Sequence, residues 1–245
     1  MNMPLRNPGE DFFRHRGDAA FRLAEALAPY RDRRPLVLGI PRGGVVMAEI
    51  LARELQGDLD VVLVRKLRAP VDSELAVGAI TEGGLLLLRD EWESIAPEEY
   101  LKQEASDALA LLRRRRGLYT PGSPPLDPRG RITIVVDDGI ATGATMSAAL
   151  RGLRGSGPAR LVVATAVAPR EIVENLRHEA DEVVCLRTPV PFHAVSQFYE
   201  DFSEVTDEDV IAILRRSRRV AAAAGGSPPH LHHGNFGLDP GRPPR

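Results

Sequence analysis

The sequence predicts an α/β fold built on a mainly parallel five-stranded sheet flanked by helices. Short apolar runs rich in Val, Ile and Leu alternate along the chain with stretches of helical spacing. Such alternation is typical of a parallel sheet with helices on both faces. Two of the apolar runs also end in glycine-rich turns that lead directly into a helix-like stretch. With 245 residues the chain can bury a substantial core. One domain with a tail and two small domains fit this length equally well.

The first half of the core is expected to contain a helix, a strand, a second helix and a second strand. Residues 11–28 have an amphipathic helical pattern, and residues 35–40 form an apolar run typical of a buried strand. A Pro-Arg-Gly-Gly turn then leads into a helical pattern over residues 45–55. The run at residues 60–66 is expected to be one further buried strand.

A long excursion separates the two halves of the core. Residues 67–131 are too many for a simple crossover between strands. They include an expected hairpin, in which residues 77–80 pair with residues 85–88 around a Glu-Gly-Gly turn. A polar helix over residues 97–116 follows. The excursion is therefore expected to be an inserted hairpin and helix.

The second half of the core repeats the alternation of strand and helix. Strands are expected at residues 132–137, 160–166 and 182–186, and helices at residues 146–154 and 171–179. From residue 217 the composition shifts to Ala, Gly, Pro and His, which predicts a disordered tail. Residues 1–216 are therefore expected to form the folded domain.

The composition argues against several classes of function. The formal net charge of −2 provides no overall field for nucleic acid or a membrane surface. The single cysteine, Cys185, allows no intrachain disulfide and has the surroundings of a packed core residue. The chain shows no secretory signal, and no apolar run approaches the ~20 residues that span a bilayer. A cytoplasmic location is the default expectation.

Residues 132–145, which read ITIVVDDGIATGAT, carry the most informative motif. The apolar run places Asp137 and Asp138 at the mouth of the sheet. Backbone N–H groups at the start of the following helix are unpaired and favour an anion, and small residues let a phosphate approach them. The motif predicts a sugar-phosphate pocket, although strand-Asp-Asp-Gly also occurs where carboxylates merely cap a helix. The expected phosphate contacts are Gly139, Ala141, Thr142, Gly143, Ala144 and Thr145.

Two other segments support a phosphate site. Arg42, Gly43 and Gly44 lie between a strand and a helix, so their N–H groups are also placed to bind an anion, although alone they indicate only a turn. Arg65 and Lys66 close the predicted strand at residues 60–66. Ligands of open α/β sheets bind at the carboxyl ends of strands, so both side chains are expected there, with a solvated strand end as the alternative.

The motif at residues 132–145 resembles the phosphoribosyl pyrophosphate (PRPP) signature of the type I phosphoribosyltransferases. The resemblance implies that Asp137 and Asp138 bind the ribose 2′ and 3′ hydroxyls, that the following loop binds the 5′-phosphate, and that the loop at Arg42 binds pyrophosphate. Hypoxanthine-guanine enzymes commonly have an aspartate where this chain has Ala141, so 6-oxopurine chemistry is disfavoured. Segments near residues 67–80 and 197–210 resemble an uncharacterised branch of the family.

The family also implies a hood of N- and C-terminal residues, and a mobile loop at residues 67–75. Phe192 and Tyr199 fall in the hood and are candidate contacts for a nucleobase, with packing against the sheet as the alternative. Glu74 in the loop and His193 in the hood are expected to play no catalytic or metal-binding part. Arg113 to Arg116 are expected to form a solvated helix end.

The reaction implied is transfer of a 5-phosphoribosyl group from PRPP to a nitrogen acceptor, with release of pyrophosphate. Its expected catalytic residues are Asp137, Asp138, Arg42 and Lys66. Mg²⁺ is the expected cofactor, held mainly by substrate oxygens with no direct protein ligand. Expected partners are small molecules, and a homo-oligomer is also compatible with the sequence. Two alternatives are a non-catalytic PRPP sensor and a phosphate-ester hydrolase with Asp137 as nucleophile.

Overall fold

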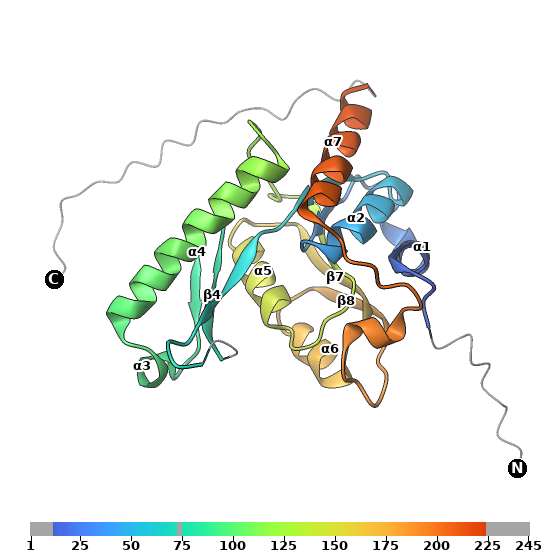
Figure 1. The fold of residues 1–245 in the computed structure, drawn as a ribbon. Helices are drawn as coiled ribbons and strands as arrows, with labels where there is room; N and C mark the ends of the chain where they lie inside the picture. Colours follow the sequence, from blue (N-terminus) through green and yellow to red (C-terminus); the bar gives the residue numbers. More distant parts are fainter. Residues whose placement is uncertain (1–11, 73–74, 224–245) are drawn as a thin grey trace, which may run out of the picture.

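The computed structural model describes residues 12–72 and 75–223 (Figure 1). Helix α7 (Asp207–Ala223) continues past residue 216, so the predicted start of the tail at residue 217 is wrong. Residues 217–223 are mostly alanine and arginine, which are strong helix formers. The rest of the predicted tail lies outside the described residues, and so do its histidines and Glu74.

A five-stranded parallel sheet forms the centre of the molecule, as predicted. Its strands lie in the order β2-β1-β6-β7-β8, and each neighbouring pair is parallel. Parallel pairing brings the carboxyl ends of β1 and β6 to the same edge, because Gly39 pairs with Val136. The strands are β1 (Leu36–Gly39), β2 (Asp58–Val61), β6 (Ile132–Asp137), β7 (Arg160–Val167) and β8 (Glu182–Arg187).

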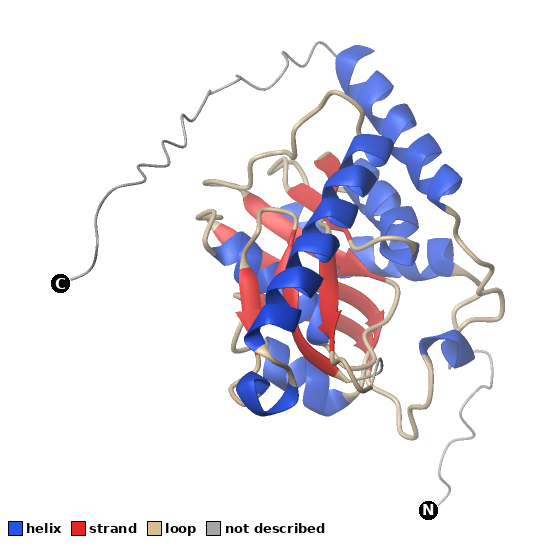
Figure 2. Ribbon diagram, turned by 60° about the vertical axis from the view of Figure 1, so that its left-hand side comes forward, coloured by secondary structure: helices blue, strands red, loops and turns tan. Residues whose placement is uncertain are grey.

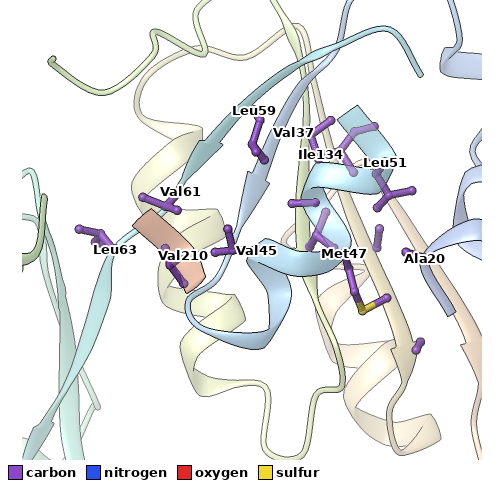
Figure 3. Packing of buried hydrophobic residues seen from close by; sticks show 14 of the residues in the cluster. Ala20, Val37, Val45, Met47, Leu51, Leu59, Val61, Leu63, Ile134 and Val210 are labelled. Carbon is purple, nitrogen blue, oxygen red and sulfur yellow. The ribbon is translucent and has the colours of Figure 1, made fainter. Parts of the chain in front are cut away.

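Helices cover both faces of this sheet, as Figure 2 shows. Successive strand residues point to opposite faces. Val37 and Ile134 therefore pack with α2 in one cluster, drawn in Figure 3, while Val135 packs with α5 in the other. The helices of the core are α1 (Arg16–Ala26), α2 (Gly43–Glu54), α5 (Ala144–Arg154) and α6 (Arg170–Leu176), and short 3-10 turns lie at Ala28–Tyr30 and Val195–Phe198.

The excursion forms a second, antiparallel sheet with the order β3-β4-β5. The predicted hairpin and polar helix are both present, on the left in Figure 1. The single strand predicted over residues 60–66 is wrong. Val62 donates its N–H to Gly39 of the core, and Leu63 accepts from Glu82 of the hairpin, so the chain changes sheets here. The elements are β3 (Val64–Arg68), β4 (Ala76–Thr81), β5 (Leu86–Leu88), α3 (Trp92–Ile95) and α4 (Glu98–Tyr119).

A buried ion-pair network joins the excursion to the core. Arg116 of α4 donates to Asp60 of β2 at 2.8 Å and to both carboxylate oxygens of Glu82, at 2.5 and 2.7 Å. Only 1% of the Asp60 side chain and 10% of the Arg116 side chain are exposed. The expectation that the arginine run is a solvated helix end is therefore wrong for Arg116. Such bidentate, desolvated contacts fix α4 firmly against β2.

The N-terminal segment and the segment after β8 lie side by side. Phe13 donates its N–H to the carbonyl of Phe198, and its own carbonyl accepts from Glu200. Helix α7 is attached to the excursion through Tyr119, whose hydroxyl donates to Asp207 at 2.5 Å. Within the described part of the chain, no helix is long and apolar enough to cross a membrane.

Candidate active site

Two adjacent carboxylates stand at the end of the central strand β6. Asp138 is buried, whereas Asp137 keeps part of its surface exposed. The N–H of Asp138 donates to Oδ1 of Asp137 over 2.9 Å. Burial raises the pKa of both carboxyl groups, and the neighbouring charge of Asp138 raises the pKa of Asp137 further. A ligand that brings hydroxyl donors or a cation would therefore stabilise this pair.

Arg16 is the ion-pair partner of Asp138, and sequence reasoning missed it. Its Nε lies 2.7 Å from Oδ2 of Asp138, and its guanidinium lies 3.8 Å from the ring centroid of Phe202. It also donates to the carbonyl of Ser203 at 2.7 Å. The Arg16 charge opposes the rise in the pKa of Asp138 that burial causes. Nothing local signals this role, because 122 positions separate the two residues.

The Pro-Arg-Gly-Gly turn after β1 lies directly against this acidic pair. A Cβ atom on Gly43 would come within 1.9 Å of Oδ2 of Asp138. A Cβ on Gly44 would come within 2.4 Å of the carbonyl oxygen of Val136. Only glycine allows these approaches. Because α2 begins at Gly43, its free N–H groups start beside the carboxylates.

The loop from Gly139 to Thr145 carries the second helix start. Gly143 adopts a φ of +75° and caps α5, which begins at Ala144. Thr142 and Ala144 are exposed, so the N-terminal turn of α5 is open to solvent. On its other side the loop is packed tightly, because a Cβ on Gly139 would meet Val195 at 2.3 Å. The structure therefore brings both glycine-rich segments and the acidic pair together at one edge of the sheet.

Arg42 points toward the C-terminal segment. Its guanidinium donates to Glu204 over 2.7 Å, and 39% of the Arg42 side chain and 75% of the Glu204 side chain are exposed. An exposed pair of this kind is weak and can be exchanged for a ligand. Arg42 is therefore available to an anion at the start of α2.

The two aromatic candidates have different surroundings. Tyr199 is 6% exposed, and its hydroxyl donates to the backbone carbonyl of Asp138 at 2.7 Å. Its ring packs between Phe13 and Phe202, with centroids 5.4 and 5.1 Å away. These contacts favour the packing role that the sequence left open for Tyr199. Phe192 keeps part of its surface exposed and packs on Phe198.

Comparison with known proteins decides the family. A family model described as the phosphoribosyl transferase domain matches residues 9–203, which is most of the chain. The chain belongs to the type I phosphoribosyltransferase family. Two curated Mycobacterium tuberculosis proteins of this family, each named "Putative phosphoribosyl transferase", are 43% identical over 218 residues. The match covers 87% of this chain and 48% of theirs, so the chain spans about half the length of these relatives.

A solved structure is also similar. Protein TT1426 from Thermus thermophilus is 50% identical, with a TM-score of 0.75. The match covers 84% of this chain and 98% of that protein. With this coverage the likeness includes at least part of the excursion as well as the central sheet. Both comparisons agree with the phosphoribosyltransferase fold described above.

The predicted position of two basic residues is wrong. Arg65 and Lys66 were expected at the carboxyl end of a core strand, but that strand, β2, ends at Val61. Both residues lie in β3 of the antiparallel sheet, where they line a pocket together with Arg68 and Arg115. At the strand ends, Arg42 and the glycine-rich loops lie beside the acidic pair.

The acidic pair fits a divalent cation that is shared with a substrate. Within residues 12–72 and 75–223, no three His, Cys, Asp or Glu side chains gather into a metal site. Asp137 and Asp138 supply carboxylate oxygens, which hard cations such as Mg²⁺ prefer, and a nearby positive charge would offset the burial that raises the pKa of both groups. Two adjacent carboxylates suit an ion that keeps most of its coordination for water and a ligand.

Proposed function

We propose that the chain transfers a 5-phosphoribosyl group from PRPP to a nitrogen acceptor and releases pyrophosphate. One observation carries the proposal: α2 begins against Asp138, and the loop that leaves Asp138 ends at the start of α5. PRPP has a phosphate at each end of a ribose that carries two hydroxyls. Two helix N-termini together with a carboxylate pair offer one group for each part of this donor.

Each side chain then has a separate part in binding. Asp137 and Asp138 accept hydrogen bonds from the ribose hydroxyls and orient the sugar. The loop from Gly139 to Thr145 binds the 5′-phosphate through the N–H groups at the start of α5. Arg42, Gly43 and Gly44 bind the pyrophosphate, for which Arg42 must leave Glu204. Fixing both ends of the donor holds the reacting carbon in place.

The chemistry demands little covalent help from the protein. Positive charge develops on the ribose ring as the C1–oxygen bond breaks, and negative charge develops on the departing pyrophosphate. The carboxylates lie near the positive ring, while Arg42 and the α2 N-terminus stabilise the leaving group. Bound Mg²⁺ would neutralise pyrophosphate oxygens, with the acidic pair as its contact on the protein.

The acceptor is proposed to be a nucleobase or a similar ring nitrogen. Partial exposure of Phe192, which packs on Phe198 of the 3-10 turn, supports a stacking surface in the hood. Ala141 supplies no carboxylate to act on N7 of a purine, so adenine, pyrimidines and pyridine carboxylates are favoured over 6-oxopurines.

The test is pyrophosphate release from PRPP and Mg²⁺ across a panel of purines, pyrimidines and pyridine carboxylates. Asp138→Asn should lower turnover by about 100-fold or more, the size expected when a group acting on the developing charge is lost. Its melting temperature should stay close to that of the parent chain. Glu208→Gln, a change at an exposed residue of α7, serves as the control.

Each alternative predicts a different result. PRPP binding without pyrophosphate release for any acceptor would indicate a sensor. Free phosphate in place of pyrophosphate would indicate a hydrolase. If Asp138→Asn loses folded protein and activity in equal measure, the assigned role of Asp138 is wrong.

A further inference from the structure

A second basic pocket lies away from the strand-end loops, between β3 and α4. Its volume is about 320 Å³, within the size range of about 300–1,000 Å³ typical of small-molecule sites. Strand β3 is the edge strand of the antiparallel sheet, so one of its sides is open to this pocket. The lining combines four cations with an apolar wall, formed by Arg65, Lys66, Arg68 and Arg115, and by Leu111 and Leu112.

Among the described residues, the four cations lack acidic partners. Within the described ranges, none of their side chains makes an ion pair, and no acidic residue lines the pocket. Two described acids nearby make contacts other than ion pairs with these four side chains. Glu104 accepts from the backbone N–H of Arg68 at 3.4 Å, and Glu82 is held by Arg116. Since the whole chain carries a net charge of −2, this local excess of positive charge is not a result of its composition.

Uncompensated cations so close together repel one another unless an anion joins them. Arginine presents a planar fork of donors that matches phosphate oxygens, and three of the four cations are arginines. Several cations along one groove match a ligand with several negative charges in a row. The leucine wall adds a surface against which an uncharged ring can pack.

We propose that the β3–α4 groove binds a polyphosphate chain, either free or as part of a nucleotide. The groove is distinct from the pocket proposed for PRPP, because none of Asp137, Asp138 and Arg42 lines it. Occupancy would join the edge strand β3 to α4 through the anion. The proposal stands whether or not the chain transfers phosphoribosyl groups.

The test is calorimetric titration of the full chain with inorganic tripolyphosphate, ATP and AMP. The double variant Arg68→Ala/Arg115→Ala removes two groove cations that have no part in the proposed reaction. Arg113→Ala/Arg114→Ala is the matched control, since it removes the same charge from exposed positions on α4. Thermal melts of each variant establish that it is folded.

Tripolyphosphate affinity should fall at least tenfold in the groove variant and stay within twofold of the parent chain in the control. AMP should bind more weakly than tripolyphosphate, and added salt should weaken both. Tighter binding of ATP than of tripolyphosphate would indicate a nucleotide as the source of the chain, and equal binding would indicate free polyphosphate. Asp138→Asn should leave tripolyphosphate affinity unchanged.

Three results would overturn the proposal. The first is no binding of tripolyphosphate at millimolar concentration by the parent chain. The second is an equal loss in the control variant, which would indicate diffuse attraction to the helix. The third is binding that survives in the groove variant but is lost in Arg42→Ala, which would place the anion at the strand-end loop. Absence of PRPP turnover would contradict the proposed function without affecting this result.

Discussion

At the scale of single residues, the charged acidic pair lowers the stability of the folded chain at the position where a ligand is proposed to bind. A carboxyl group whose pKa is higher in the folded chain than in the unfolded chain binds its proton more tightly when folded. Its stabilising contribution is present below the unfolded pKa of about 4, and it is lost as the pH rises through the folded pKa. At neutral pH the charged Asp137, partly buried beside Asp138, therefore weakens the fold.

Asp137→Asn should accordingly stabilise the chain while it abolishes function. The amide oxygen can still accept the hydrogen bond from the N–H of Asp138, and the repulsion between the two carboxylates disappears. We expect the melting temperature at pH 7.5 to rise by a few degrees and the advantage to vanish near pH 4. Thermal melts across this pH range measure it. A melting temperature lowered at every pH would contradict the account of Asp137.

Gly43 is a second residue where local geometry determines function. The side chain of an alanine here would overlap Oδ2 of Asp138, at 1.9 Å, and crowd Nε of Arg16, at 2.9 Å. We expect Gly43→Ala to displace Asp138 and to reduce PRPP affinity at least tenfold, as measured by titration. Gly117→Ala is the control. Apart from its chain neighbours and the backbone of its own helix, no atom lies within 4 Å of its added Cβ, so this change in α4 should stabilise the helix by about 0.5–1 kcal/mol. Equal affinities in the two variants would contradict the role of Gly43.

At the scale of elements, the sequence is informative wherever the signal is local. Both junctions of strand, glycine-rich turn and helix could be predicted, because each is contained in a dozen or so neighbouring residues. The break between β2 and β3 could not, because Val62 and Leu63 continue the apolar run and only their pairing with different sheets reveals it. Arg116 was hidden in a run of arginines, since its partners Asp60 and Glu82 lie 56 and 34 positions away. The role of Arg16 could not be predicted for the same reason, since Asp138 lies 122 positions away.

The network around Arg116 joins α4 to β2, and its contribution to stability can be tested. Arg116→Met leaves the buried Asp60 without its cation, and loss of one partner from a buried pair typically costs about 3–5 kcal/mol. Urea unfolding should show a loss of this size. Arg114→Ala, at an exposed position of the same helix, should change stability by less than about 0.5 kcal/mol.

Adding Asp60→Asn and Glu82→Gln to Arg116→Met should recover much of the lost stability, since no uncompensated charge then remains. If the single and triple variants are equally unstable, packing of the Arg116 side chain matters more than its charge.

At the scale of the whole molecule, the excursion and the central sheet share one hydrophobic core. Leu67 and Leu112 of the excursion belong to the same buried cluster as Val45 and Met47 of α2. Val210 of α7 also belongs to it, close to Val45 and Val61 in Figure 3. The site is assembled by the same arrangement, because residues of α1, the β1–α2 turn, β6 and the segment before α7 meet at Asp138. Loss of any one layer should therefore loosen the site.

A shared core predicts that the two sheets unfold together. We expect a single calorimetric transition whose van't Hoff and calorimetric enthalpies agree. Leu112→Ala opens a cavity within the excursion and should lower the free energy of unfolding by about 2–5 kcal/mol. The single transition should move as a whole to lower temperature. Leu118→Ala is the control, because this side chain of the same helix is 48% exposed. A second transition at lower temperature in Leu112→Ala would mean that the excursion unfolds separately from the central sheet. In that case the β3–α4 groove could open while the strand-end site stays intact.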